Sequence, residues 1–261
     1  MTRTRRPIRT AGENLFTYQT LKIYSARCLR PGHDMTILIC FALKEEAAPF
    51  RKITANRADV FTLIVGIGRQ NAETSVRAFL ANHAPELVLT CGFAGGLNPE
   101  LKLGEVVWET ANEKLRAQFL AAGAPSAKIF CADRIATTVV EKKKLRAETG
   151  ADAVEMESAA IHAVCAEKKI PCATVRVISD TAHEDLPLDF NALAKPDKSL
   201  DFGKLLLAIA KSPGKIGALL ALQQKTSFAA RQLANVLGKI ISPAPVTGSP
   251  ALFRAGHSWP K

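Results

Sequence analysis

Short apolar runs alternate with amphipathic segments through the centre of the chain. From Met35 the sequence enters the run TILICFA, and comparable runs recur as far as ATVRVIS at 173–179. Between them, apolar residues recur every three or four positions, which is typical of helices with one buried face. Strands are predicted at 36–42, 60–65, 86–91, 128–131, 152–155 and 173–179, and helices at 45–54, 69–82, 138–148 and 158–169. This alternation indicates an α/β fold built on one continuous sheet.

The pattern changes at both ends of this central region. Residues 1–34 are basic and show no sustained period, so we expect the folded domain to begin at Met35 and to extend to 190. A start codon assigned upstream of Met35 and a short basic targeting arm both explain this leader. The apolar clusters LLLAIA, IGALLAL and ANVLGKII predict two or three amphipathic helices within 191–241. The proline-rich segment 242–261 is expected to be an irregular tail.

Composition supports the α/β prediction, and the distribution of charge narrows the function. Aromatic residues make up only 6% of the chain, whereas Ala, Val, Ile and Leu are abundant, which suits strands covered on both faces by helices. The net charge of +11 divides into +5 for residues 1–34, +8 for 191–261 and −2 for the centre. Because the folded centre is close to neutral, we do not expect nucleic-acid binding as the main function.

Cysteine and histidine positions indicate neither disulfides nor a metal site. The six cysteines form no C-x-x-C pair and lie mostly in apolar runs, so they are expected to be reduced core residues. The five histidines are scattered without ligand spacing. The chain has no apolar run long enough to span a membrane, and the basic leader lacks the apolar stretch of a signal peptide. A cytoplasmic location is therefore expected.

Candidate chemistry lies where the predicted strands end. The motif KEE at 44–46 follows the first strand, GIG at 66–68 the second, and CGFAGG at 91–96 the third. The carboxyl ends of parallel strands meet at one edge of a sheet, which is where open α/β sheets bind ligands. These motifs also have purely structural explanations, because acidic residues favour the first turn of a helix and glycines permit tight turns.

Two carboxylates, Glu155 and Glu157, end a strand that the pattern carries into the core. Alternation along a strand places both on one face, with Met156 on the other. In a cleft, a carboxylate can accept both hydrogens of a vicinal diol, which is a common way to hold a sugar. The alternative is a strand end exposed to solvent.

Arg176 and Asp180 flank the apolar end of the last predicted strand, at the same edge of the sheet. A partly buried aspartate surrounded by hydrogen-bond donors can act as a general acid. The alternative is an aspartate that only caps the following turn.

Taken together, LKEE, GIG, CGFAGGL, VEMES and RVISDTA resemble the purine nucleoside phosphorylase and methylthioadenosine/adenosylhomocysteine nucleosidase superfamily. The order and spacing match from residue 35 to about 190. The resemblance implies a single three-layer domain with a mixed central sheet flanked by helices. It also implies cleavage of the N-glycosidic bond of an adenosine-like nucleoside with release of adenine. No cofactor is implied, water or inorganic phosphate is the co-substrate, and the protein is expected to be a homo-oligomer.

The resemblance assigns roles by position. Asp180 matches the catalytic acid that protonates or hydrogen-bonds N7 of the purine as the bond to C1′ breaks, and Glu46 matches the carboxylate that activates water. Glu157 matches the residue that holds the ribose hydroxyls, with the thioether of Met156 packed against the ribose. Charges that develop in the transition state are stabilised by such groups.

The nucleophile and the base are assigned in the same way. Arg176 and Gly68 match the nucleophile site, and Arg176 is the charged partner expected for phosphate if phosphate attacks. The residues expected to contact the base are Phe93, Ala94, Gly95 and Ile135. Phe93 departs from the family pattern, because small hydroxyl residues are common at its position.

The C-terminal part resembles the extension of hopanoid-biosynthesis-associated nucleoside phosphorylases, which act on an adenosyl lipid. The stretch between Trp108 and Phe130, which usually helps to form the pocket for the base and the 5′ group, is also short. A long apolar 5′ substituent would explain both features, and a basic amphipathic appendage can rest on the inner face of an anionic membrane. Packing on the sheet or a subunit contact explains the helices equally well.

Three alternatives to this reading stay open. A soluble methylthioadenosine or adenosylhomocysteine nucleosidase would consume a 5′-thio nucleoside rather than a lipid nucleoside. A non-catalytic nucleoside-binding module would keep the fold without the activity, although the presence of Asp180, Glu157 and Arg176 argues against it. A nucleic-acid binder that uses the basic ends would lose affinity steeply with salt.

Overall fold

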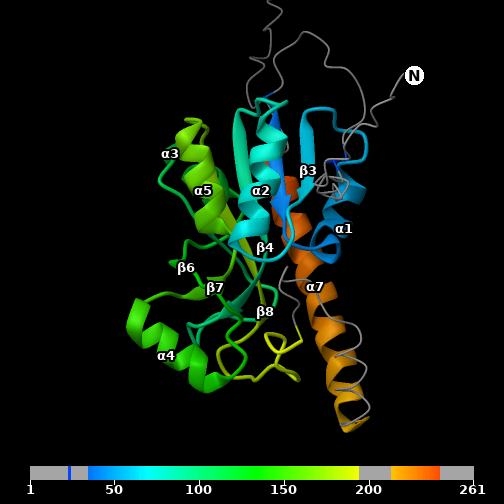
Figure 1. Ribbon diagram of the computed structural model, residues 1–261, viewed down its shortest axis with the longest axis vertical. Coiled ribbons are helices and arrows are strands. Elements are labelled where there is room, and N and C mark those ends of the chain that lie inside the picture. The colour runs from blue at the N-terminus through cyan, green and yellow to red at the C-terminus, as the bar shows by residue number, and fades with distance from the viewer. Residues whose placement is uncertain (1–22, 25–34, 194–212, 242–261) are drawn as a thin grey trace, which may run out of the picture.

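The computed structural model describes residues 23–24, 35–193 and 213–241, which form one sheet covered by helices (Figure 1). The elements are β1 (Ile23–Tyr24), β2 (Ile37–Phe41), α1 (Lys44–Ile53), β3 (Val60–Ile64), α2 (Arg69–Leu80), β4 (Leu87–Gly96), β5 (Val106–Glu109), α3 (Glu113–Ala121), β6 (Ile129–Cys131), α4 (Val139–Thr149), β7 (Ala153–Glu155), α5 (Ser158–Glu167), β8 (Cys172–Asp180), a 3-10 turn (Pro213–Lys215) and α7 (Ile216–Ile241). All ten elements predicted from the pattern of the centre are present. The leader apart from 23–24, the apolar cluster LLLAIA and the tail lie outside the described residues.

The strands form a single eight-stranded mixed sheet. Strands β3, β2, β4 and β8 are parallel neighbours in that order. Three further strands pair antiparallel, β1 with β3, β5 with β8 and β7 with β4, and β6 runs parallel to β7. The predicted α/β class and the mixed sheet are confirmed, and the four parallel strands carry their carboxyl ends to the same edge.

The third predicted strand is longer than the sequence suggested. The expected end at residue 91 is wrong, because β4 continues through the glycine-rich segment to Gly96. Strand β7 pairs with Gly95 and Gly96, beyond the end of β2, while β8 pairs along the other side. Glycines weaken an isolated strand, but here the two neighbouring strands supply hydrogen bonds.

Elements β5 and α3 were not predicted; Asn112 caps α3 by accepting from the backbone N–H groups of Lys114 and Leu115.

Helices cover both faces of the sheet, which makes three layers. Helices α2 and α5 bury Val76, Phe79 and Ile161 against one face. Helices α1, α3 and α7 cover the other face, where Phe50, Phe119 and Leu233 enter the larger core. Four of the five described cysteines are buried and Cys172 is partly buried, so their predicted place in the core is confirmed.

The C-terminal helix α7 is part of this core. Two or three helices were predicted for the three apolar clusters, and two of these clusters, IGALLAL and ANVLGKII, share the continuous helix Ile216–Ile241. Its C-terminal half lies along α1 (Figure 1) and buries Leu233 and Leu237 completely, each contributing about 1.5–3 kcal/mol of hydrophobic stabilisation. Its N-terminal half exposes Ile216 and Leu220. No helix within the described ranges is both long and apolar enough to cross a bilayer.

Candidate active site

The predicted site residues gather where β4, β7 and β8 end. In the register of β4 and β8, Gly92 lies beside Arg176 and Gly95 beside Asp180. The first turns of α1 and α5 bring Glu46 and Glu157 to the same edge. Parallel pairing thus collects groups that are far apart in the sequence.

Arg176 is the centre of a buried cluster of charges. Its side chain is 1% exposed, and its Nη2 donates a very short hydrogen bond to Glu155 and a 3.1 Å bond to Oγ1 of Thr90. Glu157 lies 3.8 Å from the same nitrogen. Burial opposes the charge, but the nearby carboxylates, Glu155 above all, raise the pKa of Arg176. The guanidinium is therefore a permanent positive charge.

Glu155 is the structural partner of this arginine. Its carboxylate also accepts from the Ser158 hydroxyl at 2.5 Å and from the backbone N–H groups of Glu157 and Ser158, both at 2.9 Å. Burial alone would raise its pKa, yet Arg176 and these hydrogen bonds lower it. Glu155 and Glu157 are both buried, so the alternative of a solvent-exposed strand end is wrong.

Glu157 points toward the start of α2. Its Oε1 accepts the backbone N–H of Gly68 at 2.8 Å, while Oε2 faces Arg176. Burial raises the pKa of Glu157 despite the opposing effect of Arg176. The backbone N–H of Gly68, expected at the nucleophile site, is therefore already occupied by a carboxylate.

Glu46 is held by two backbone donors. Its Oε2 accepts the N–H of Leu43 at 2.9 Å, and its Oε1 accepts the N–H of Phe93 at 2.8 Å. The side chain is buried, and this burial, reinforced by the charge of Glu157, raises the pKa of Glu46 to about 7 against the effect of both hydrogen bonds and of Arg176. A carboxyl with this pKa can take up a proton near neutral pH, as a general base requires.

Gly92 permits Glu46 and Arg176 to approach each other across β4. A Cβ at this position would lie 2.7 Å from Oε1 of Glu46 and 2.8 Å from Nη1 of Arg176. Its φ of +153° also lies outside the range that side chains favour. A glycine is needed at position 92 because any side chain there would separate Glu46 from Arg176.

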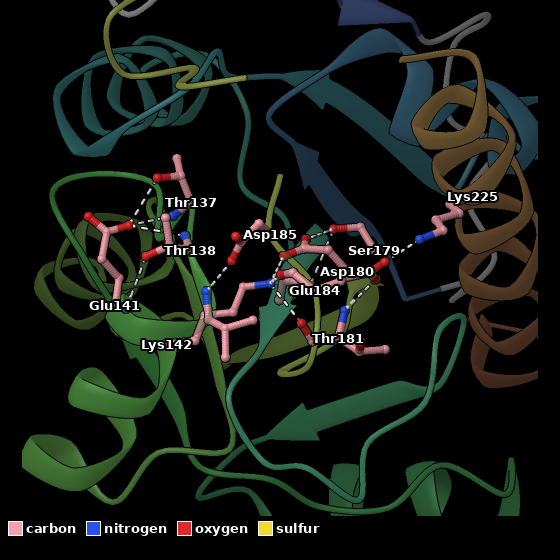
Figure 2. A network of polar contacts seen from close by, with 12 residues as sticks. Thr137, Thr138, Glu141, Lys142, Ser179, Asp180, Thr181, Glu184, Asp185 and Lys225 are labelled. Atoms are coloured by element: carbon pink, nitrogen blue, oxygen red, sulfur yellow. Dashed lines mark hydrogen bonds and ion pairs between the residues drawn. The ribbon is translucent and has the colours of Figure 1, made fainter. Parts of the chain in front are cut away.

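Asp180 ends β8 at a second part of the site. Its side chain accepts from the Ser179 hydroxyl at 2.8 Å through Oδ1, and its Oδ2 lies 2.6 Å from Nζ of Lys142 (Figure 2). A cavity of about 180 Å³ is lined by Asp180, by the loop 184–187 and by residues 218–225 of α7. A larger cavity of about 570 Å³, around 98–105 and 125–127, contains none of the predicted site residues.

The structure gives less information about the other residues that were predicted to contact the ribose or the base. Met156 and Ala94 are buried. Phe93 packs partly against the larger core while its N–H binds Glu46. Ile135 exchanges two backbone hydrogen bonds with the Asn191 side chain, both at 2.9 Å, and no described contact joins it to Asp180. Its assignment to the base stays a prediction.

Sequence reasoning missed Lys142. It stands in the charged run EKKK, which suggests a solvated helix face, yet its side chain is fully buried. Helical spacing could have indicated the burial of Lys142, because it lies three residues before Leu145, which packs on a core cluster.

No group of residues that could hold a metal ion occurs in the described part of the chain.

Comparison with known proteins places this arrangement in a family. Residues 42–116 and 108–211 match the phosphorylase superfamily, and the chain belongs to that family. The aminodeoxyfutalosine nucleosidase of Campylobacter jejuni is 27% identical, over 48% of this chain and 69% of its own length. The 5′-methylthioadenosine/S-adenosylhomocysteine nucleosidase of Shewanella halifaxensis is 28% identical, over 51% and 73%.

Solved structures agree with this placement at the level of the fold. The 5′-methylthioadenosine/S-adenosylhomocysteine nucleosidase of Campylobacter jejuni superimposes with a TM-score of 0.59 at 21% identity, covering 79% of this chain and 98% of that one. Futalosine hydrolase of Helicobacter pylori superimposes with a TM-score of 0.60 at 17% identity, covering 79% and 97%. The three-layer domain is therefore the shared fold.

Proposed function

We propose that this chain hydrolyses the N-glycosidic bond of an adenosine-like nucleoside and releases adenine. The observation that carries the proposal is Glu46, a buried carboxyl with a pKa of about 7 beside the Arg176 cluster. Asp180 lies farther along the same sheet edge. An acid for the leaving base and a base for the incoming water are the two groups that such a reaction requires. Family membership and the names of the relatives support this reaction class.

In this mechanism the nucleoside lies with its base toward Asp180 and its ribose toward Glu157. Asp180 gives a proton to N7 as the electrons of the C1′–N9 bond pass to the purine, so that the base leaves as a neutral molecule. Glu157 accepts hydrogen bonds from the ribose hydroxyls and stabilises the developing positive charge on the sugar. Glu46 removes a proton from the water that attacks C1′, and no other co-substrate is needed.

The charge of the cluster favours water over phosphate as the nucleophile. Arg176 faces three carboxylates, Glu46, Glu155 and Glu157, and its Nη2 is already bonded to Glu155 and Thr90. A phosphate dianion would meet a surplus of negative charge there. Phosphorolysis has one observation in its favour, because Nε of Arg176 has no partner among the described residues.

The 5′ substituent of the substrate is proposed to be apolar. Helix α7 contributes Ala218, Ala221 and Leu222 to the cavity beside Asp180, and Ile216 and Leu220 are exposed nearby on the same helix. Exposed apolar side chains beside a pocket suit a long apolar group or contact with a membrane surface. This observation supports an adenosyl lipid over a 5′-thio nucleoside, and adenosylhopane is the substrate to try.

Adenine release from adenosine, methylthioadenosine and adenosylhopane, each with and without phosphate, tests the proposal. Asp180→Asn should lower kcat by about 10²–10⁴-fold. The control Asp133→Asn, at a side chain that is 86% exposed, should keep native rates. Release that needs phosphate would replace hydrolysis by phosphorolysis. If the native chain released adenine from none of the three, the binding-module alternative would be favoured.

A further inference from the structure

A buried lysine forms an ion pair with the carboxylate of Asp180. Lys142 of α4 is 0% exposed, and its Nζ lies 2.6 Å from Oδ2 of Asp180, 2.7 Å from the carbonyl oxygen of Thr181 and 2.9 Å from that of Glu184 (Figure 2). An ammonium has three N–H donors, and all three are used. A buried charge is costly unless it is paired in this way, so the ammonium is fixed against Asp180.

This contact conflicts with a simple reading of Asp180 as an acid. A neighbouring ammonium favours the ionised carboxylate, whereas the proposed reaction needs a proton to pass to the leaving base. The conflict is removed if the pair shares one proton. The three hydrogen bonds of Lys142 are arranged for this, because a neutral amine could still donate to both carbonyls and turn its lone pair toward Asp180.

We propose that the Lys142–Asp180 pair stores the proton that the leaving base receives, with Lys142 as the positioning residue behind Asp180. An N–H bond of the ammonium breaks and an O–H bond forms on Asp180, which leaves a neutral amine and a carboxylic acid. That proton then passes to N7 of the purine while the C1′–N9 electrons move onto the base. Solvent returns a proton to the pair after adenine leaves. This inference rests on the proposed function.

Other charged groups around the pair are already engaged. Glu184 accepts the N–H of Thr181 at 2.8 Å and forms a very short ion pair with Lys225 of α7. Lys142 contributes to the lowered pKa of Glu184, although burial opposes this and Lys225 acts more strongly. Glu184 and Lys225 offset each other, so they leave the charge balance of the Lys142–Asp180 pair unchanged.

Two further acidic residues, Glu141 and Asp185, bind the N-terminal end of α4 and the loop before it. Glu141 accepts from the backbone of Thr137 at 2.7 Å and pairs with Arg134 at 2.5 Å. Asp185 accepts the N–H of Val139 at 2.6 Å. Three further carboxylates surround Arg176, four residues before Asp180 on β8, and among them Glu46 takes up a proton near pH 7. Among the described residues, Asp180 is therefore the only carboxylate that Lys142 contacts.

The pH dependence of kcat separates proton storage from a structural role. Lys142→Met removes the stored proton, so Asp180 must bind its own from solvent. Relative to the native chain at the same pH, its kcat should fall by less than about threefold at pH 5 and by about 10²-fold at pH 8. Lys142→Arg keeps the charge but does not release its proton, and should lose about 10²-fold at both pH values. Lys144→Met, at an exposed site in the same helix, should match the native chain.

Two outcomes would overturn the inference. A loss that is equal at pH 5 and pH 8 in Lys142→Met would indicate a structural role, and so would recovery of activity in Lys142→Arg. Taking the ratio to the native rate at each pH removes the effect of Glu46 from the comparison.

A second readout keeps this inference separate from the proposed function. The ¹³C signal of the Asp180 carboxyl, assigned by its absence in Asp180→Asn, should stay at the ionised position from pH 5 to 8 in the native chain and in Lys142→Arg. In Lys142→Met it should move to the protonated position at the acidic end. If the native chain released no adenine, the proposed function would fail while this titration still decided the state of the pair. Identical titrations in the native chain and Lys142→Met would refute proton storage.

Discussion

Replacing Glu46 by glutamine tests whether burial truly raises the pKa of this carboxyl. In the folded chain the pKa rises from 4.5 to about 7, so the folded state binds a proton more tightly than the unfolded state. Below pH 4.5 both states are protonated and the group costs nothing. As the pH rises to 7, the unfolded state ionises first and the folded state loses stability. At about 1.4 kcal/mol per pH unit, the full loss is about 3 kcal/mol.

The glutamine variant lacks this pH-dependent loss. Glu46 accepts from the N–H groups of Leu43 and Phe93, whereas a glutamine offers only one oxygen, so one N–H loses its partner. That loss costs about 1–3 kcal/mol, and it is the same at every pH. The free energy of unfolding of the variant, measured relative to the native chain, should therefore rise by about 2.5 kcal/mol between pH 5 and pH 8.

Urea unfolding of both chains at pH 5 and pH 8 measures this difference. Glu45→Gln, at the exposed neighbouring residue, is the matched control and should show no such change. At pH 8 the kcat of Glu46→Gln should also fall by about 10²–10⁴-fold, because the base is lost. A difference in stability that stays constant within about 0.5 kcal/mol across this range, where the linkage requires a change of about 2.5 kcal/mol, would refute a raised pKa.

Three further substitutions test packing at and around the site. Gly92→Ala places a Cβ 2.7 Å from Oε1 of Glu46, so kcat should fall at least about tenfold with a stability loss of about 1–3 kcal/mol; native rates would show that the close approach is unimportant. Glu155→Ala leaves the buried Arg176 without its main partner and should cost about 3–5 kcal/mol of unfolding free energy in urea; a loss below about 1 kcal/mol would contradict that pairing. Gly104→Ala, with φ +80° and Cε1 of Phe228 only 2.3 Å away, should lower Tm more than the control at Gly123, which has φ +82° and nothing within 4 Å; equal losses would argue against the docking of α7 there.

The local pattern of the sequence was enough to predict the layered fold. Apolar runs and helical spacing depend on which side chains avoid water, and this preference is encoded within each segment. The strand ends also pointed to Glu46, Glu157, Arg176 and Asp180, because parallel pairing brings such ends to one edge. The segment 97–127 was missed because β5 depends on its pairing with the distant β8, and because α3 exposes Leu120 while it buries Leu115 and Phe119, which blurs the helical pattern.

Only the tertiary structure decided how the charges are paired. The bond between Gly68 and Glu157 joins residues 89 positions apart, and the contact of Arg176 with Glu155 spans 21. The pKa of Glu46 depends on its burial, and the inward direction of Lys142 depends on its contacts with the segment 180–184. Composition and motif order thus determined the fold and the kind of chemistry. Burial and partner choice arise from long-range packing, so they decided which carboxyl has a raised pKa, which is paired with Arg176 and which is paired with Lys142.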